Sequence, residues 1–147
     1  MIQRVQSLYL LLATIALILT YFYPYCTVGY LELRNYHFIA AEGMVVPDFI
    51  SWHSLPLGVS LILHMVILFS FKNRIFQIRM IRYNEVLILS SYVFGVISIY
   101  KVYGDYGTGF HAGIATWMLV LALVFNQMAR RAIRKDEALV KSVDRIR

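Results

Sequence analysis

VQSLYLLLATIALILTYFYPYCTVGYL, residues 5–31, is the stretch that decides the fold, because 27 consecutive residues lack Asp, Glu, Lys and Arg. About 20 apolar residues in a helix cross the hydrocarbon core of a bilayer. Three further uncharged runs follow in the chain, over residues 49–71, 86–100 and 106–129. The run over 86–100 is short for a span, but flanking Tyr83, Tyr103 and Lys101 can extend it at the interfaces.

The four uncharged runs predict an all-α membrane protein with an up-down bundle of four transmembrane helices. The predicted helices lie near residues 6–24, 53–71, 84–102 and 109–128. Residues 25–52 form the predicted outer loop, and residues 129–147 form a basic tail. The whole chain is thus expected to be a single domain.

The composition supports a membrane protein. Of 147 residues, 60% are hydrophobic and 15% are charged, with a mean hydropathy of +0.65. Soluble domains are closer to half apolar and a quarter charged. The composition therefore disfavours a soluble globule and a disordered chain, and the single cysteine, Cys26, excludes an intramolecular disulfide.

The distribution of basic residues predicts the orientation. Twelve of the 14 Lys and Arg residues lie in the segments expected on one side of the membrane, and only Arg34 and Lys101 lie on the other. Basic residues concentrate in cytoplasmic loops, so both termini are predicted to be cytoplasmic. The same distribution explains the net charge of +6 through topology and anionic lipids, and we do not expect nucleic-acid binding.

Two segments outside the spans have patterns of their own. Residues 30–39 alternate polar and apolar side chains around Arg34-Asn35, which predicts a small β-hairpin on the outer surface. Residues 130–147 contain no Gly or Pro and have an apolar stripe at helical spacing, which predicts a basic cytoplasmic helix. Residues 72–82 are predicted to form either a short interfacial helix or an extension of the flanking helices.

Three histidines are the candidate ligand-binding residues. His64 is the polar side chain expected nearest mid-bilayer, while His53 and His111 are expected near the outer surface, with His37 in the loop between the first two spans. They predict either hydrogen-bonded histidines that tie helices together or a small quinone, haem or metal site. Haem needs a second axial ligand at the same depth, which the chain does not supply, and no metal-ligand motif is present. We therefore expect no resident cofactor.

Other polar and small residues suggest contacts between helices. Glu85 is predicted to pair with Arg82 at the cytoplasmic start of the third span. Gly109 and Gly113 form a GxxxG pattern, which favours close helix packing at the entrance to the fourth span. An oligomeric channel lined by Ser90, Ser91, Ser98 and His64 is a further alternative, although no charged residue lies in mid-span.

Three stretches of the chain carry a family resemblance. They are MIQRVQSLYLLL (1–12), the connection containing KNR (72–74), QIR (77–79) and RYN (82–84), and RAIRKDEALVKSVDR (131–145). The sequence resembles an uncharacterised family of small four-span bacterial membrane proteins, known only as a domain of unknown function. This resemblance implies the inner membrane of a Gram-negative cell, and it supplies no activity, cofactor or catalytic residue.

All three matching stretches lie on the predicted cytoplasmic side, which directs attention to that surface. We expect a non-enzymatic accessory or assembly subunit of a larger membrane complex, with membrane lipids and partner proteins as its ligands. The residues expected to bind them are Lys72, Arg74, Arg79, Arg82, Arg131, Arg134, Lys135 and Asp136.

Overall fold

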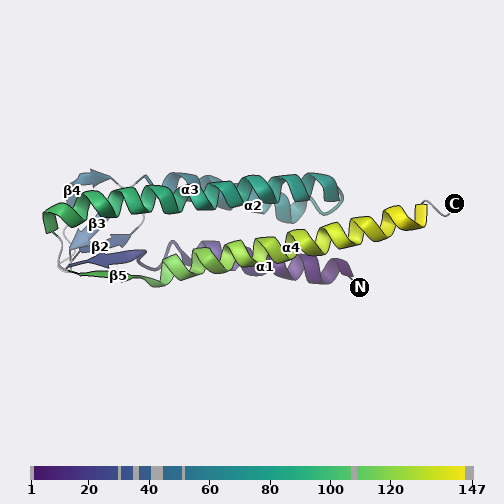
Figure 1. The fold of residues 1–147 in the computed structure, drawn as a ribbon, viewed down its shortest axis with the longest axis horizontal. Coiled ribbons are helices and arrows are strands. Elements are labelled where there is room, and N and C mark those ends of the chain that lie inside the picture. Colours follow the sequence, from purple (N-terminus) through teal and green to yellow (C-terminus); the bar gives the residue numbers. More distant parts are fainter. Residues whose placement is uncertain are drawn as a thin grey trace.

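The computed structural model describes residues 2–29, 31–34, 37–40, 45–50, 52–106 and 109–144. Four helices make up most of this part of the chain: α1 (Ile2–Leu19), α2 (Ser54–Phe69), α3 (Arg74–Tyr106) and α4 (Ile114–Asp144). They run along the long axis of the molecule, with both chain ends at one end of the bundle and a small sheet at the other (Figure 1). We call these the terminal end and the sheet end. The prediction of a mainly helical chain is confirmed.

Three helices, α1, α3 and α4, extend beyond the predicted limits at the terminal end. Residues 74–82 belong to α3, so they extend a flanking helix and do not form a separate interfacial one. The side-chain oxygen of Asn73 accepts a hydrogen bond from the backbone N–H of Phe76 at 3.1 Å, which caps the start of α3. The predicted basic helix of the tail is the continuation of α4, which is described as far as Asp144.

At the sheet end, the predicted first and fourth helices are too long. The segment before α4 forms strand β5 (Phe110–Ala112), so Gly109 and Gly113 are not on a helix. The backbone N–H of Gly113 donates to the Tyr25 carbonyl oxygen at 2.7 Å, and a Cβ at Gly113 would lie 2.1 Å from the Pro24 carbonyl oxygen. The glycine therefore permits a close approach between two connecting segments, and the GxxxG prediction is wrong.

The sheet contains the predicted hairpin and three additional strands. Its strands are β1 (Cys26–Val28), β2 (Leu31–Arg34), β3 (His37–Ala40), β4 (Val45–Ile50) and β5, in the order β4-β3-β2-β1-β5. Strands β2 and β3 pair antiparallel, with Arg34 opposite His37, so Arg34 belongs to a strand although we predicted it in the turn. Pairing of β5 with β1 joins the two connections at this end of the bundle.

The core is built largely along the antiparallel pair α1 and α4. Gln6 Nε2 donates to the Ala132 carbonyl oxygen at 3.3 Å, which fixes their relative register at the terminal end. Buried positions recur at alternating spacings of three and four on both helices, as in antiparallel coiled-coil seams. These positions are Gln6, Leu10, Ala13 and Leu17 on α1 with Thr20 directly after it, and Leu119, Ala122, Asn126, Ala129 and Ile133 on α4.

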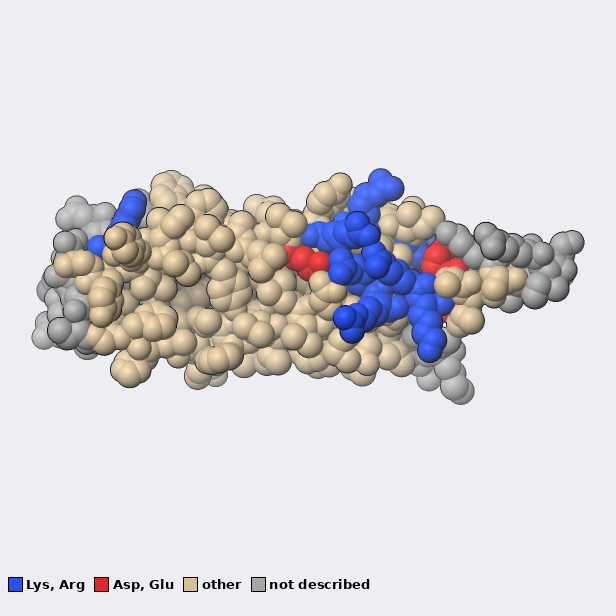
Figure 2. All heavy atoms as spheres, in the orientation of Figure 1, with Lys and Arg blue, Asp and Glu red and all other residues tan. Residues whose placement is uncertain are grey.

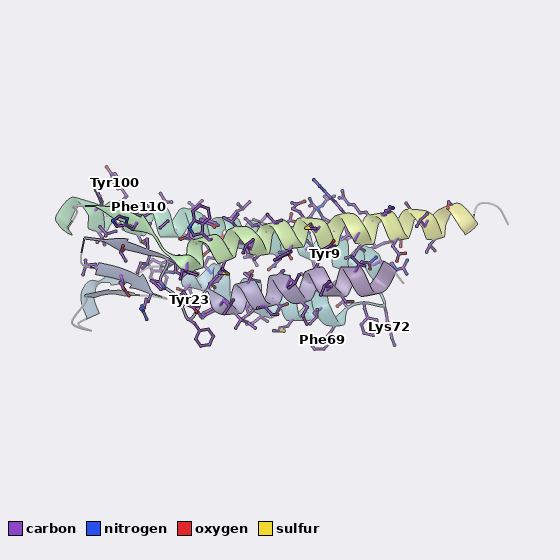
Figure 3. All side chains as sticks on the ribbon, turned by 90° about the horizontal axis from the view of Figure 1, so that it is seen from below. Tyr9, Tyr23, Phe69, Lys72, Tyr100 and Phe110 are labelled. Carbon is purple, nitrogen blue, oxygen red and sulfur yellow. The ribbon has the colours of Figure 1, made fainter. Side chains whose placement is uncertain are left out.

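Polar side chains are buried in this bundle while large apolar ones are exposed. Ser60, His64 and Asn84 are fully buried, whereas Ile62 and Phe69 on α2 are 69% and 73% exposed. Figure 3 shows Phe69 and Tyr23 directed away from the helices. Exposed apolar side chains are present on all four helices, including Leu11 and Ile15, Val59 and Ile62, Val86 and Val93, and Trp117 and Val124.

By length and apolarity, one helical stretch within the described residues, Arg74–Gly104, could cross a membrane. Val5–Leu19 and Ser54–Phe69 are apolar but have fewer than 18 residues. These criteria therefore do not recover the predicted four transmembrane helices. A single such helix gives weak support for a membrane location.

Candidate functional site

A chain of hydrogen bonds around His64 connects three helices. The Ser60 hydroxyl donates to Asn84 Oδ1 at 2.7 Å, and Asn84 Nδ2 lies 2.9 Å from His64 Nδ1. On the other side of the ring, His64 Nε2 lies 3.1 Å from the Leu10 carbonyl oxygen. Because a carbonyl oxygen only accepts, Nε2 carries the proton and Nδ1 accepts from Asn84. The network thus links α1, α2 and α3 through fully buried side chains.

Both ring nitrogens of His64 are used within this network. An axial haem ligand or a metal ligand needs one nitrogen lone pair, and Nδ1 accepts from Asn84 while Nε2 donates to Leu10. The arrangement fits the first of the two sequence predictions, a histidine that ties helices together, and it leaves no nitrogen of His64 for a bound group.

The other candidate histidines have different surroundings. His53 is fully buried just before α2, and its ring packs edge-on against Tyr25 with ring centroids 4.3 Å apart. His111 lies in the exposed strand β5, opposite Thr27 of β1. His37 begins β3, and its side chain is outside the described part of the structure. Within the described residues, no group of three His, Cys, Asp or Glu side chains is arranged to hold a metal ion.

A small apolar cavity lies at the sheet end. Its volume is about 100 Å³, and its lining includes Cys26 from β1, Tyr92 from α3 and Phe110 from β5. The Tyr92 hydroxyl donates to the Thr116 carbonyl oxygen of α4, so this polar atom is already satisfied. Burial raises the pKa of the Cys26 thiol to about 12, which keeps it neutral and unreactive at ordinary pH. Neither of these two lining side chains therefore offers a reactive group at ordinary pH.

The predicted lipid- and partner-binding residues gather at the terminal end. Lys72 lies in the α2–α3 connection, three of the arginines lie on α3, and the rest of the set lies on α4. Figure 2 shows Lys and Arg side chains concentrated on one face there, beside a long surface without charged residues. We call this group the basic rim: Lys72, Arg74, Arg79, Arg82, Arg130, Arg131, Arg134 and Lys135.

Two residues of the predicted binding set bind each other. Arg74 at the start of α3 forms an ion pair with Asp136 on α4, with nitrogen and oxygen 3.0 Å apart. Their side chains are 22% and 13% exposed. This pair attaches the far part of α4 to the α2–α3 connection. We therefore assign Arg74 and Asp136 to positioning the basic rim, while Arg79, Arg82, Arg131, Arg134 and Lys135 remain exposed.

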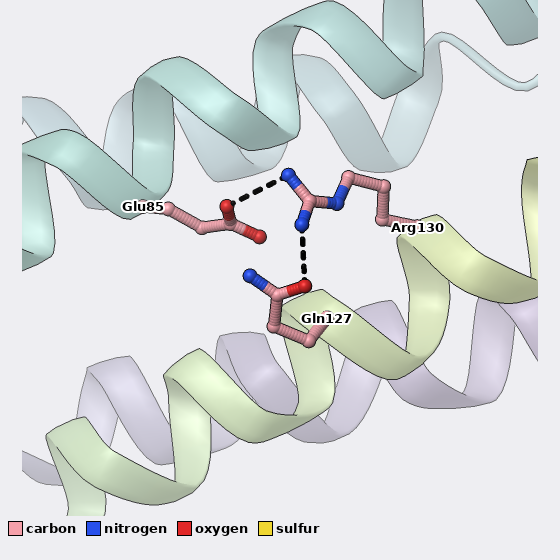
Figure 4. A network of polar contacts seen from close by, with 3 residues as sticks. All are labelled: Glu85, Gln127 and Arg130. Atoms are coloured by element: carbon pink, nitrogen blue, oxygen red, sulfur yellow. Dashed lines mark hydrogen bonds and ion pairs between the residues drawn. The ribbon is translucent and has the colours of Figure 1, made fainter.

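A second ion pair joins α3 to α4 (Figure 4). The Glu85 carboxylate is 3.1 Å from the Arg130 guanidinium, which also donates to Gln127 Oε1. An ion pair of Glu85 was predicted, but with Arg82 of the same helix. Arg130 and Gln127 were missing from the predicted site. The signal for Arg130 was available, since Glu85 and Arg130 each border one of the uncharged runs.

Sequence reasoning also missed Asn126. This side chain is fully buried in the α1–α4 seam, and neither its oxygen nor its nitrogen has a hydrogen-bond partner within the described structure. Its spacing from Ala122 and Ala129 is that of a core position, which the sequence shows but which we did not use. A polar group in this state lowers stability.

The fold and its two polar regions define a four-helix protein with a capping sheet, a buried histidine network and a basic rim. The chain belongs to the family described as Domain of unknown function (DUF4293), which matches residues 2–146. This confirms the resemblance to an uncharacterised family. Among curated proteins, none matches the chain.

Proposed function

We propose that the chain is a four-span protein of a bacterial inner membrane with both termini in the cytoplasm. In this proposal it acts as a non-enzymatic accessory or assembly subunit that binds a partner protein through the basic rim. The observation that carries the proposal is the position of the exposed basic side chains, at the end of the bundle next to an uncharged apolar surface (Figure 2).

The distribution of exposed and buried side chains supports a lipid environment. Burying Ser60, His64 and Asn84 while exposing Ile62 and Phe69 reverses the usual arrangement of a soluble bundle. In lipid, exposed apolar side chains are solvated, and interior polar groups tie helices together. With 18 and 16 residues, α1 and α2 reach about 27 Å and 24 Å at 1.5 Å per residue. Thinning of the bilayer can accommodate such lengths.

The charge asymmetry supports the orientation. The basic rim and both chain ends lie together at the terminal end, whereas Arg34 and Lys101 are the two basic residues towards the sheet end. Exposed Tyr100, Tyr103 and Trp52 also lie towards the sheet end, where an aromatic belt would be expected. Tyr25 does not contribute to that belt because it is buried.

The exposed part of the basic rim supports a binding role. Arg131 and Lys135 are four residues apart on α4, so they lie on one face of the helix, and both are exposed. Glu85 and Asp136 pair with Arg130 and Arg74, whereas the positions three and four residues from Arg131 and Lys135 along α4 carry no acidic residue. A partner with an acidic surface would complement them.

Cysteine accessibility tests the topology. In a Cys26→Ser background, Ser142→Cys at the terminal end should be labelled by an impermeant maleimide only after the membrane is opened. Arg34→Cys in strand β2 at the sheet end should be labelled in spheroplasts, because Arg34 is exposed and lies in the predicted outer loop. Labelling of both positions in intact spheroplasts, or of neither, would refute the proposed topology.

Site-specific photocrosslinking tests partner binding. A photoreactive residue at Lys135 should give one reproducible crosslinked product in native membranes, and the same residue at Tyr100 should not. Charge reversal at Arg131 should abolish that product, since it removes the electrostatic match. An identical pattern from both positions, or a product unaffected by Arg131→Glu, would refute binding through the basic rim.

A further inference from the structure

Three arginines lie on the same part of α3 and α4 as the Glu85 carboxylate, with Arg82 three residues before it on α3 and Arg134 four residues after Arg130 on α4. Glu85 forms the 3.1 Å ion pair with Arg130, and its carboxylate also lies within electrostatic range of Arg82 and Arg134. Three positive charges against one negative charge leave an excess of two. Arg130 is engaged by Glu85 and Gln127, whereas the side chains of Arg82 and Arg134 are exposed. The cluster therefore presents two guanidinium groups for an external anion.

The depth of this cluster matches the boundary of the apolar surface. Glu85 and Arg130 are the first charged residues beyond the uncharged runs 86–100 and 106–129. If these runs lie in hydrocarbon, as the proposed topology requires, the arginines lie at the level of the lipid phosphates. Anions at this level come mainly from the lipid itself.

An apolar stripe leads away from Arg82 along α3. Val86, Leu89 and Val93 follow Arg82 at spacings of four, seven and eleven residues, which places them on one helix face. All three are more than half exposed. A phosphate next to a lipid-facing apolar stripe is the arrangement that a phospholipid presents, with its head group at the arginines and its acyl chain along the stripe.

We propose that Arg82 and Arg134 bind the phosphate of an anionic phospholipid whose acyl chain lies along Val86, Leu89 and Val93. Guanidinium groups bind phosphate through two parallel hydrogen bonds, and the charge excess of the cluster complements the head group. Glu85 acts as a positioning residue, because its ion pair holds Arg130 and joins α3 and α4, the helices that carry Arg82 and Arg134. This site rests on the proposed four-span topology. It assigns Arg82 and Arg134 of the basic rim to lipid and leaves Arg131 and Lys135 for a protein partner.

Native mass spectrometry of the purified full chain in detergent tests this site. Phosphatidylglycerol should bind more tightly than phosphatidylcholine, which has a phosphate but no net charge. The variant Arg82→Gln/Arg134→Gln should weaken phosphatidylglycerol binding by about tenfold or more, since one charge-assisted hydrogen bond is worth about a factor of ten. Arg82→Lys/Arg134→Lys keeps the charge and loses the forked geometry, so it should show a smaller loss.

The matched control is Arg34→Gln/Lys101→Gln, which removes the same charge at the sheet end. It should leave phosphatidylglycerol binding unchanged. Equal losses in both double variants, or no preference for the anionic lipid, would overturn the proposal. Competition by inorganic phosphate at equal concentration would indicate a soluble anion site, and tighter binding of an acidic peptide to the same arginines would indicate a protein site. Either result would overturn the lipid assignment, while cysteine labelling would still report independently on the topology.

Discussion

Asn84 and His64 form a polar contact that joins α3 to α2, with Asn84 Nδ2 donating to His64 Nδ1 across 2.9 Å. The same amide accepts a hydrogen bond from the Ser60 hydroxyl through its oxygen. One side chain therefore satisfies two buried partners on α2, and the ring it orients reaches the α1 backbone at Leu10. These hydrogen bonds therefore connect α1, α2 and α3 through side chains that are fully buried and have no access to solvent.

Asn84→Leu should lower the free energy of unfolding by about 1–3 kcal/mol, because it leaves Ser60 and His64 without their partner in the interior. Reversible unfolding in detergent measures this loss. Ser90→Ala is the matched control, since within the described part of the chain the Ser90 hydroxyl donates to Leu87 of its own helix. We expect a change below about 0.5 kcal/mol there, and similar values for the two variants would contradict a bridging role for Asn84.

Gly113→Ala should destabilise the sheet end by about 1–3 kcal/mol, because the added Cβ would lie 2.1 Å from the Pro24 carbonyl oxygen and must displace backbone. Gly104→Ala is the control, because a Cβ there has no neighbour within 4 Å and Ala is favoured over Gly in a helix. Hydrogen exchange of β1 and β5 measures the local effect. Unchanged protection in Gly113→Ala would show that the two connecting segments are not in close contact.

The sequence was sufficient to predict the elements that are determined by neighbouring residues in the chain. Uncharged runs located all four helices, and alternation located the β2–β3 hairpin. Strand β5 was missed because it forms only by pairing with β1, more than 80 residues earlier. Phe110, His111 and Ala112 are compatible with a helix when considered locally, and the long-range pairing overrides that preference.

The candidate site was predictable to a similar degree. The charge distribution predicted that most basic residues gather at the end that holds both termini, which the structure shows, while their binding role stays a prediction. The partners within it were not predictable, since Arg82 and Arg130 are both available to Glu85 and only the packing of α3 on α4 selects Arg130. The role of His64 was left open by sequence because it depends on Asn84 and Leu10, which lie on two other helices.

Asp136→Asn should release the far part of α4 from the α2–α3 connection, because it removes the ion pair with Arg74. The pair is partly exposed, so the loss in global stability should be at most about 1 kcal/mol. Hydrogen exchange should rise over residues 137–144 and stay unchanged in α1. The charge swap Arg74→Asp/Asp136→Arg should restore protection, and failure of both effects would rule out this attachment.

Cys26 should resist alkylation in the folded protein at pH 8, because it is 1% exposed and its thiol pKa is raised to about 12. In the unfolded chain the thiol ionises near its ordinary pKa of 9.0. The neutral thiol therefore favours the folded state fully below pH 9, and this contribution is lost as pH rises from 9 towards 12. Maleimide labelling with and without denaturant measures the protection.

Exposed Ser142→Cys, in a Cys26→Ser background, provides the control for reagent reactivity. It should react at the same rate in folded and unfolded protein. Labelling of Cys26 in the folded protein as fast as at position 142 would show that the apolar cavity beside β1 is open to solvent.

Asn126→Leu should stabilise the protein by about 1–2 kcal/mol, in contrast to the same change at Asn84. Both asparagines are fully buried, but neither polar atom of Asn126 has a partner in the described structure, whereas Asn84 bonds to two side chains. Replacing an unsatisfied buried amide removes a desolvation penalty. Replacing a satisfied one leaves two buried groups, here Ser60 and His64, without a hydrogen-bond partner. Unfolding of the two variants side by side separates these cases. A loss at Asn126→Leu as large as that at Asn84→Leu would mean that Asn126 contacts a polar group in the α1–α4 seam, and the assignment of this position as unsatisfied would be wrong.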